Sequence, residues 1–210
     1  MAVTTTTLAA LAGDPLADRV AAGAAERATN GCLQLSGVTV DLGPWPAVPH
    51  AVTGTLRHAS ASIAAATVGS LTIRDVQARL GLVEFTPLGA LHGKPRVRKV
   101  EGSATVRITQ TDLDRYLARR GLPGDITIHH QEPQLQFQVA GLDLPLTLST
   151  QAGALVISPP LPSLSRLGLR VSIEGIAVTA IRPEDAQLLI TAHFAGQPGA
   201  LACAARSAVE

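Results

Sequence analysis

The chain has 210 residues, of which 46% are hydrophobic, 2% aromatic and 16% charged, and its formal net charge is +1. This length suits one domain with a substantial core. No basic stripe alternates with aromatic residues, so nucleic acid is not an expected partner. Because aromatic rings normally fill wide cores, this aliphatic composition predicts a thin two-layer core or a smooth cavity that another molecule fills.

The first 13 residues, "MAVTTTTLAALAG", are expected to be disordered or weakly structured. They lack the basic start and long apolar run of a signal peptide, and no stretch of the chain reaches the apolar length that spans a bilayer. The sequence as it stands therefore predicts a cytoplasmic protein. A cell-envelope location is the alternative if a native signal or anchor was removed.

A first helix is expected between Asp14 and Asn30. Asp14 is a good N-cap, Pro15 suits the first helical position, and the Asn30-Gly31 pair supplies a stop signal. This segment opens a single expected domain over residues 14–196.

Two cysteines, Cys32 and Cys203, lie near opposite ends of the chain. They are too few for a disulfide scaffold and do not have metal-ligand spacing. We expect free thiols, with a bridge only if the two ends of the chain meet. No metal and no cofactor are expected.

From Leu33 onwards the hydrophobic pattern has a period of two, which predicts strands. Within "SLTIRDVQARLGL" the alternation changes phase near Arg74 and Asp75. Such a change predicts a β-bulge, or a strand that crosses from one layer to another.

A second helix is predicted over "DLDRYLARRG". Thr111 and Asp114 have the spacing of a capping box, and Leu113, Tyr116 and Leu117 form one apolar face. Strands return after it and continue to Gly196, while residues 197–210 are expected to form a weakly structured C-terminal tail.

Strands in hairpin order, without alternating helices, predict an α+β fold that is mainly β. We expect a long curved antiparallel sheet that wraps into a barrel-like or tubular shape with two helices. Such a sheet can close over a hydrophobic interior.

No catalytic constellation is recognisable. The six histidines are expected in structural or surface roles, and His129 and His130 would point to opposite faces of a strand. Glu84 or Asp143 could serve as a general acid only if it faced an apolar cavity, which would raise its pKa. We assign no catalytic residue, and whether the chain is an enzyme stays open.

The order of several segments resembles the actinobacterial LmeA-type phospholipid-binding proteins. The segments are "DRVAAGAAER", "LQLSGVTVDLGPWPAVPHAVTG", "LRHASASIAAATVGSLTIRDVQARL" and "GSATVRITQTDLDRYLA", and the resemblance spans about 18–196. Its most specific part is a Gly-aromatic-Pro loop, matched by Gly43, Trp45 and Pro46. Pro44 is inserted here, and a second aromatic residue is missing.

The resemblance implies a β-rich fold akin to tubular lipid-binding domains, holding a phospholipid. Three hypotheses remain open. The first is a module that binds a phospholipid, acyl chain or polyketide-like molecule in an aliphatic cavity, with possible transient membrane contact. The second is a cytosolic cyclase or isomerase that folds a polyketide-like substrate in that cavity by orientation, and the third is a structural or partner-binding domain. The candidate lining residues are Trp45, Val48, Ile63, Phe85, Tyr116 and Phe137.

Trp45 either closes one end of that cavity or packs against the sheet and so holds its loop in place. Pro44 and Pro46 restrict the loop, so the indole loses little entropy on binding. If it closes the cavity, Trp45→Ala should weaken hydrophobic-ligand binding more than it lowers stability. Unchanged binding, measured by titration with a fluorescent fatty acid, would identify Trp45 as a packing residue.

Overall fold

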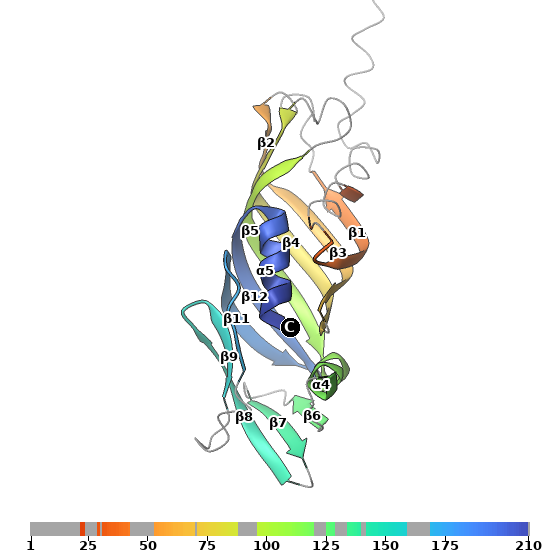
Figure 1. Ribbon diagram of the computed structural model, residues 1–210, viewed down its shortest axis with the longest axis vertical. Coiled ribbons are helices and arrows are strands. Elements are labelled where there is room, and N and C mark those ends of the chain that lie inside the picture. The colour runs from red at the N-terminus through yellow and green to blue at the C-terminus, as the bar shows by residue number, and fades with distance from the viewer. Residues whose placement is uncertain are drawn as a thin grey trace, which may run out of the picture.

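The computed structural model describes residues 22–23, 29, 31–42, 53–69, 71–87, 96–119, 125–128, 134–139, 142–158 and 169–209. Two antiparallel sheets dominate it, with the helices α4 and α5 packed beside the larger sheet (Figure 1). The predicted class, α+β and mainly β, is confirmed. The described strands form an open, curved sheet rather than a closed barrel, because the larger sheet runs from β1 at one edge to β11 at the other.

The larger sheet, called sheet A, has the strand order β1-β3-β4-β5-β12-β11, and the short β2 pairs with β4. Its strands are β1 (Gln34–Asp41), β2 (Thr55–Leu56), β3 (Ala59–Val68), β4 (Leu71–Phe85), β5 (Val97–Thr109), β11 (Ile176–Glu184) and β12 (Gln187–Gly196). The 15 residues of β4 extend over about 50 Å at the usual rise per residue. Sheet A is therefore long enough to present extended binding surfaces.

The predicted irregularity at Arg74 and Asp75 is confirmed as a β-bulge in β4. Arg74 pairs with Arg107 of β5, whereas Gln77 pairs with Thr105, so β4 carries one extra residue between them. Asp75 has a φ of 47°, in the left-handed region. The extra residue accounts for the change of phase in the sequence.

The smaller sheet, sheet B, has the order β10-β9-β8-β7-β6. Its strands are β6 (Asp125–Ile128), β7 (Gln134–Val139), β8 (Leu142–Gln151), β9 (Ala154–Ser158) and β10 (Leu169–Val171). The main hydrophobic cluster joins this sheet to one end of sheet A and to helix α4 (Gln110–Arg119). Its buried members are Ile108, Leu113, Ile126, Ile128, Leu146, Leu148, Ile157, Leu188 and Ile190.

Helix α4 is capped two residues earlier than the sequence analysis predicts. The hydroxyl of Thr109 accepts the backbone N–H of Asp112 at 3.2 Å and donates to the carboxylate of Asp112 at 2.7 Å. The N-terminal hydrogen bonds of the helix are therefore made by Thr109 and Asp112 rather than by the predicted pair Thr111 and Asp114. Asp114 instead accepts the backbone N–H of Ile126 at 2.7 Å, which fastens β6 to the helix.

Asp112 is a buried carboxylate that ties α4 to sheet A. Only 1% of the residue is exposed, and its oxygens accept hydrogen bonds from Arg74 Nε at 2.8 Å and from Arg115 Nη1 at 3.1 Å. Burial by itself raises the pKa of Asp112, but the hydrogen bonds from Arg74 and Thr109 and the nearby positive charges outweigh it, so the pKa lies below the ordinary 3.8. The carboxylate is therefore held in its charged form.

Most of the C-terminal segment, expected to be a weakly structured tail, forms helix α5 (Pro198–Val209). Proline suits the first helical position and alanine is the best helix former, while Ala202 and Ala205 are buried. Of the helix expected between Asp14 and Asn30, residues 22–23 are described and are helical, and most of the rest lies outside the described residues. Within the described ranges, none of the helices combines the length and apolarity required to cross a bilayer.

Candidate functional site

The register of sheet A aligns polar residues on one face and aliphatic residues on the other. Side chains alternate between the two faces along each strand. On one face, four consecutive strands of the sheet place in line the polar row Ser60, Arg79, Ser103 and His193. On the opposite face, the adjacent positions of the same strands place in line the alanine row Ala61, Ala78, Ala104 and Ala192. The sheet thus carries two chemically different surfaces.

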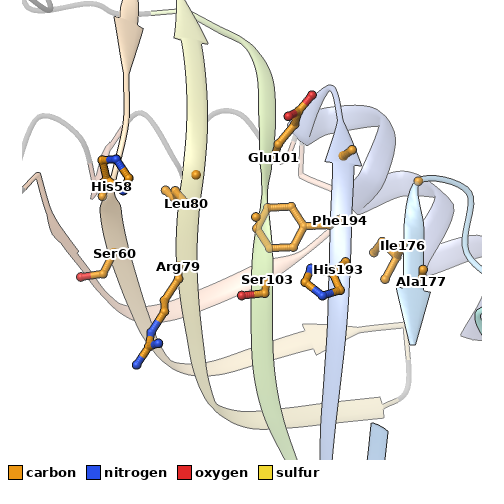
Figure 2. Close-up of a pocket in the computed structure, with 15 residues that line it drawn as sticks. His58, Ser60, Arg79, Leu80, Glu101, Ser103, Ile176, Ala177, His193 and Phe194 are labelled. Atoms are coloured by element: carbon orange, nitrogen blue, oxygen red, sulfur yellow. The ribbon is translucent and has the colours of Figure 1, made fainter. Parts of the chain in front are cut away.

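The polar row lines a groove, shown in Figure 2. The groove consists of two adjoining hollows, of about 940 and 510 Å³, and both are lined by Ser60, Arg79 and Ser103. His58 and His193 line the first hollow together with apolar residues, among them Leu80, Ile176 and Phe194. Hydroxyl and amide side chains dominate the second hollow, which contains Thr39, Asp41, Ser62, Gln77, Thr105 and Thr191. We call the two hollows together the polar groove.

Several hydrogen-bond donors of the polar groove have no partner within the described part of the chain. These are the guanidinium of Arg79, the imidazoles of His58 and His193, and the hydroxyls of Ser60 and Ser103. An arginine offers five donors in a planar fork that matches phosphate and carboxylate groups. The groove can therefore bind an anionic, oxygen-rich ligand.

The acidic residue Glu101 also lines the first hollow but is paired with Lys99. The hydrogen bond to Glu101, and then its negative charge, raise the pKa of Lys99. Because Lys99 balances the charge of this carboxylate, Glu101 repels an anion at Arg79 less than an unpaired carboxylate would. His58 has a φ of 62°, in the left-handed region, and side chains held in such backbone conformations are enriched at binding sites.

Gly102 brings the strands close together behind the groove. A Cβ atom at Gly102 would overlap the carbonyl oxygen of Arg79 and would lie 3.0 Å from Cζ of Phe194. Any larger residue would therefore push β4 and β12 away from β5. The glycine allows the ring of Phe194 to lie across β5, as Figure 2 shows.

The aliphatic face continues on both sides of the alanine row. One neighbouring row brings Ile63 beside Val38 and Val76, and the other brings Leu80 beside Ala59. Ala59 is buried at 2% exposure, but Ile63 and all four members of the alanine row are only partly buried. This face therefore keeps aliphatic surface that can contact another molecule.

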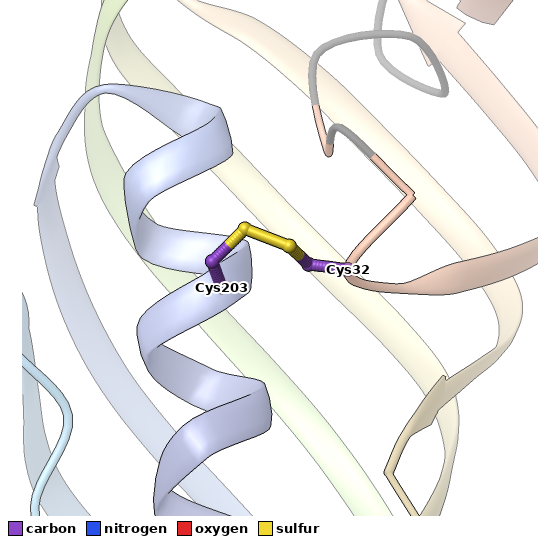
Figure 3. The surroundings of a disulfide bond; sticks show 2 residues. All are labelled: Cys32 and Cys203. Carbon is purple, nitrogen blue, oxygen red and sulfur yellow. A yellow bond between two sulfur atoms is a disulfide. The ribbon is translucent and has the colours of Figure 1, made fainter.

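Helix α5 packs on the aliphatic face and is linked to β1 by a disulfide. The side chain of Leu201 lies next to Gly196, on the face of β12 that carries Ala192. Cys203 of α5 is bonded to Cys32, immediately before β1, with their Cα atoms 5.0 Å apart (Figure 3). The expectation of free thiols is wrong, because the fold brings the two ends of the chain together.

The structure distributes the candidate lining residues over separate regions. Ile63 lies on the aliphatic face, and Phe85 packs against a hydrophobic cluster of Leu56, Ala59 and Val83 at one end of it. Tyr116 is 3% exposed and packs with Val68 and Ala205. Trp45 and Val48 lie outside the described residues, as does the side chain of Phe137, whose backbone pairs with Ile126 and Leu144. The role of these residues in binding stays a prediction.

Sequence reasoning missed the polar groove. The alternation of serine with alanine over "HASASIAAATV" distinguishes the two faces of β3, yet it does not indicate that Arg79 and His193 come into line with Ser60. In "DVQARLGL", Gln77 and Arg79 alternate with Val76, Ala78 and Leu80, which indicates the solvent face of this strand but not the residues of other strands that meet there.

Comparisons with known proteins agree with the resemblance found in the sequence. A family model described as LmeA-like phospholipid-binding matches residues 9–197, which is most of the chain. Searches of curated proteins and of solved structures gave no match. The chain belongs to the LmeA-like phospholipid-binding family.

Proposed function

We propose that the protein binds the acyl part of a lipid along the aliphatic face of sheet A, beside helix α5. One observation carries this proposal: the alanine row and Ile63 remain partly exposed on a continuous aliphatic surface that the described elements do not fully cover. Membership of a phospholipid-binding family supports a lipid as the ligand.

The alanine row suits an extended hydrocarbon chain. Small side chains leave a smooth surface, so methylene groups approach the sheet closely across four strands. Each buried methylene contributes about 0.8 kcal/mol, and a chain of about 16 carbons would gain about 13 kcal/mol before its ordering costs are subtracted. Such a ligand needs few polar contacts, which agrees with the absence of a polar motif in the sequence of this face.

The test places the same charge on the two faces of β3. Ile63→Lys puts an ammonium group on the aliphatic face, and Ser62→Lys puts it at the neighbouring position on the polar face. We expect Ile63→Lys to weaken binding of a fluorescent fatty acid or phospholipid at least tenfold, because the charge must be desolvated against hydrocarbon. Ser62→Lys should bind like the wild type.

Thermal unfolding of both variants checks that they are folded, and Ile63→Ala serves as a milder variant if Ile63→Lys is not. Equal binding by wild type, Ile63→Lys and Ile63→Ala would overturn the proposal. Conversion of a polyketide-like substrate, lost in Ile63→Lys but not in Ser62→Lys, would favour the cyclase or isomerase alternative at the same surface.

We also propose that the protein works in an oxidising compartment, in agreement with the cell-envelope alternative rather than the cytoplasmic one. The disulfide between Cys32 and Cys203 supports this location, because disulfides persist outside reducing cytosol. Thiol labelling of the protein in freshly lysed native cells tests it. Protection of both cysteines until a reductant is added is expected, and immediate labelling would contradict the proposal.

A further inference from the structure

We propose that the polar groove of sheet A is a second binding site, for a phosphate ester that bears a hydroxylated group. The polar row of this site lies on the opposite face of the sheet from the alanine row. The phosphate would sit at Arg79, which lies where the two hollows adjoin.

Arg79 is the residue on which the phosphate site depends. Its side chain is exposed and makes no ion pair or hydrogen bond within the described part of the chain. Ser60 and Ser103 flank it in register on β3 and β5, about 5 Å away on either side at the usual spacing of cross-strand neighbours. A guanidinium between two hydroxyl donors supplies charge and hydrogen bonds to the same phosphate.

The histidines extend the donor set at the first hollow. His193 is the cross-strand neighbour of Ser103, and His58 lines the same hollow from the segment between β2 and β3. Figure 2 shows His58, Arg79 and His193 displayed along the same groove. These rings offer additional nitrogen donors to phosphate oxygens.

The acidic residues of the groove do not compete with a phosphate at Arg79. Glu101 lines the first hollow and is paired with Lys99, while Asp41 lines the second hollow. Neither carboxylate is free of interactions, so the guanidinium of Arg79, which lines both hollows, is the group that attracts an anion. The hydroxyl and amide side chains of the second hollow, which include Ser62, Gln77 and Thr105, match the hydroxyl groups of a polyol rather than a hydrocarbon chain.

Titration with glycerol 1-phosphate, followed by backbone amide NMR shifts, tests the site with a soluble ester. Vesicles of phosphatidylcholine with and without phosphatidylglycerol, followed by co-flotation, test the same chemistry on a membrane. Arg79→Gln should weaken binding tenfold or more, because it removes a charge-assisted contact, and Arg79→Lys should retain part of it, since it keeps the charge but loses the planar fork.

Arg182→Gln is the matched control, because Arg182 is an exposed arginine of β11 that lies outside the groove. Arg79-dependent binding of glycerol 1-phosphate supports a soluble ester as the ligand, and Arg79-dependent binding to the phosphatidylglycerol vesicles alone supports a headgroup in a membrane. Binding to neither probe, or equal losses in Arg79→Gln and Arg182→Gln, would overturn the inference. Fatty-acid binding by Arg79→Gln should equal that of the wild type, so the outcome is independent of the aliphatic face.

Discussion

Cys203→Ser is expected to lower the free energy of unfolding by about 2–5 kcal/mol. The bond joins cysteines separated by 171 positions, so breaking it releases a long loop in the unfolded chain and increases its entropy. Denaturant titration of the variant and of the wild type, with and without reductant, measures the loss. Reductant should destabilise the wild type by the same amount and leave the variant unchanged.

Cys32→Ser provides the control for Cys203→Ser. Because both substitutions break one bond, either single variant and the double variant should be equally unstable rather than additive. Hydrogen exchange separates two sources of the loss: faster exchange confined to α5 indicates a helix that detaches locally, and faster exchange throughout the chain indicates a global effect. Reactive thiols in the folded wild type, with no effect of reductant, would refute the bond.

The features predicted correctly from the sequence depend on neighbouring residues. The period-two pattern of "SATVRIT" and similar segments indicates strands because side chains alternate between faces. The bulge was predictable for the same reason: inserting Asp75 changes the phase of β4 within a few residues. Helix α4 was found from its apolar spacing, although the hydroxyl of Thr109, rather than that of Thr111, caps it.

The features that the sequence analysis missed depend on contacts between distant segments. Cys32 and Cys203 can bond only because α5 crosses the aliphatic face towards the start of β1. The alanine-rich segment after Gly196 carried its own signal, Pro198 followed by strong helix formers. The small residues of this segment nevertheless lead to the prediction of a weakly structured tail.

The polar groove could not be predicted from the sequence for a similar reason. Its residues belong to six strands and the segments that connect them, and their alignment depends on the register of each strand pair. A shift of one residue between β4 and β5 would turn Ser103 to the aliphatic face. The geometry of the groove therefore depends on the strand register as much as on Arg79. This register is determined by the bulge at Asp75, by the extra residue between Leu80 and Leu82, and by Gly102.

The two proposed sites would bind different parts of a lipid on the two faces of sheet A. The aliphatic face suits hydrocarbon, whereas the polar groove suits a phosphate ester, and the backbone of the sheet lies between them. A protein with both sites could hold an acyl chain on one face while the other face contacts a phosphate-bearing surface or a soluble ester, and Ile63→Lys and Arg79→Gln should then affect separate binding reactions.

Asp112→Asn is expected to lower the free energy of unfolding by about 2–3 kcal/mol at neutral pH. The substitution keeps the shape of a fully buried side chain but removes the charge that Arg74 and Arg115 contact at 2.8 and 3.1 Å. Both arginine side chains are about half exposed, so water can solvate their charges in the variant. This solvation limits the loss of stability. Denaturant titration measures the difference from the wild type.

The matched control is Asp75→Asn, which changes the same group in an exposed ion pair. The Asp75 and Arg107 side chains are 57% and 46% exposed and lie 3.3 Å apart, so this substitution should cost less than about 1 kcal/mol. Equal losses at Asp75 and Asp112 would show that burial and the hydrogen bond from Thr109 add nothing.

The contribution of Asp112 to the free energy of unfolding should depend on pH. Its pKa lies below the ordinary value of 3.8 in the folded protein, so the unfolded chain takes up the proton first as the pH falls. The stabilisation is therefore complete well above pH 3.8 and is lost as the pH falls through the lowered pKa of the folded state. The difference in stability between wild type and Asp112→Asn should be constant near neutral pH and shrink in acid, whereas a difference that grew in acid would mean that Asp112 is stabilised in its protonated form.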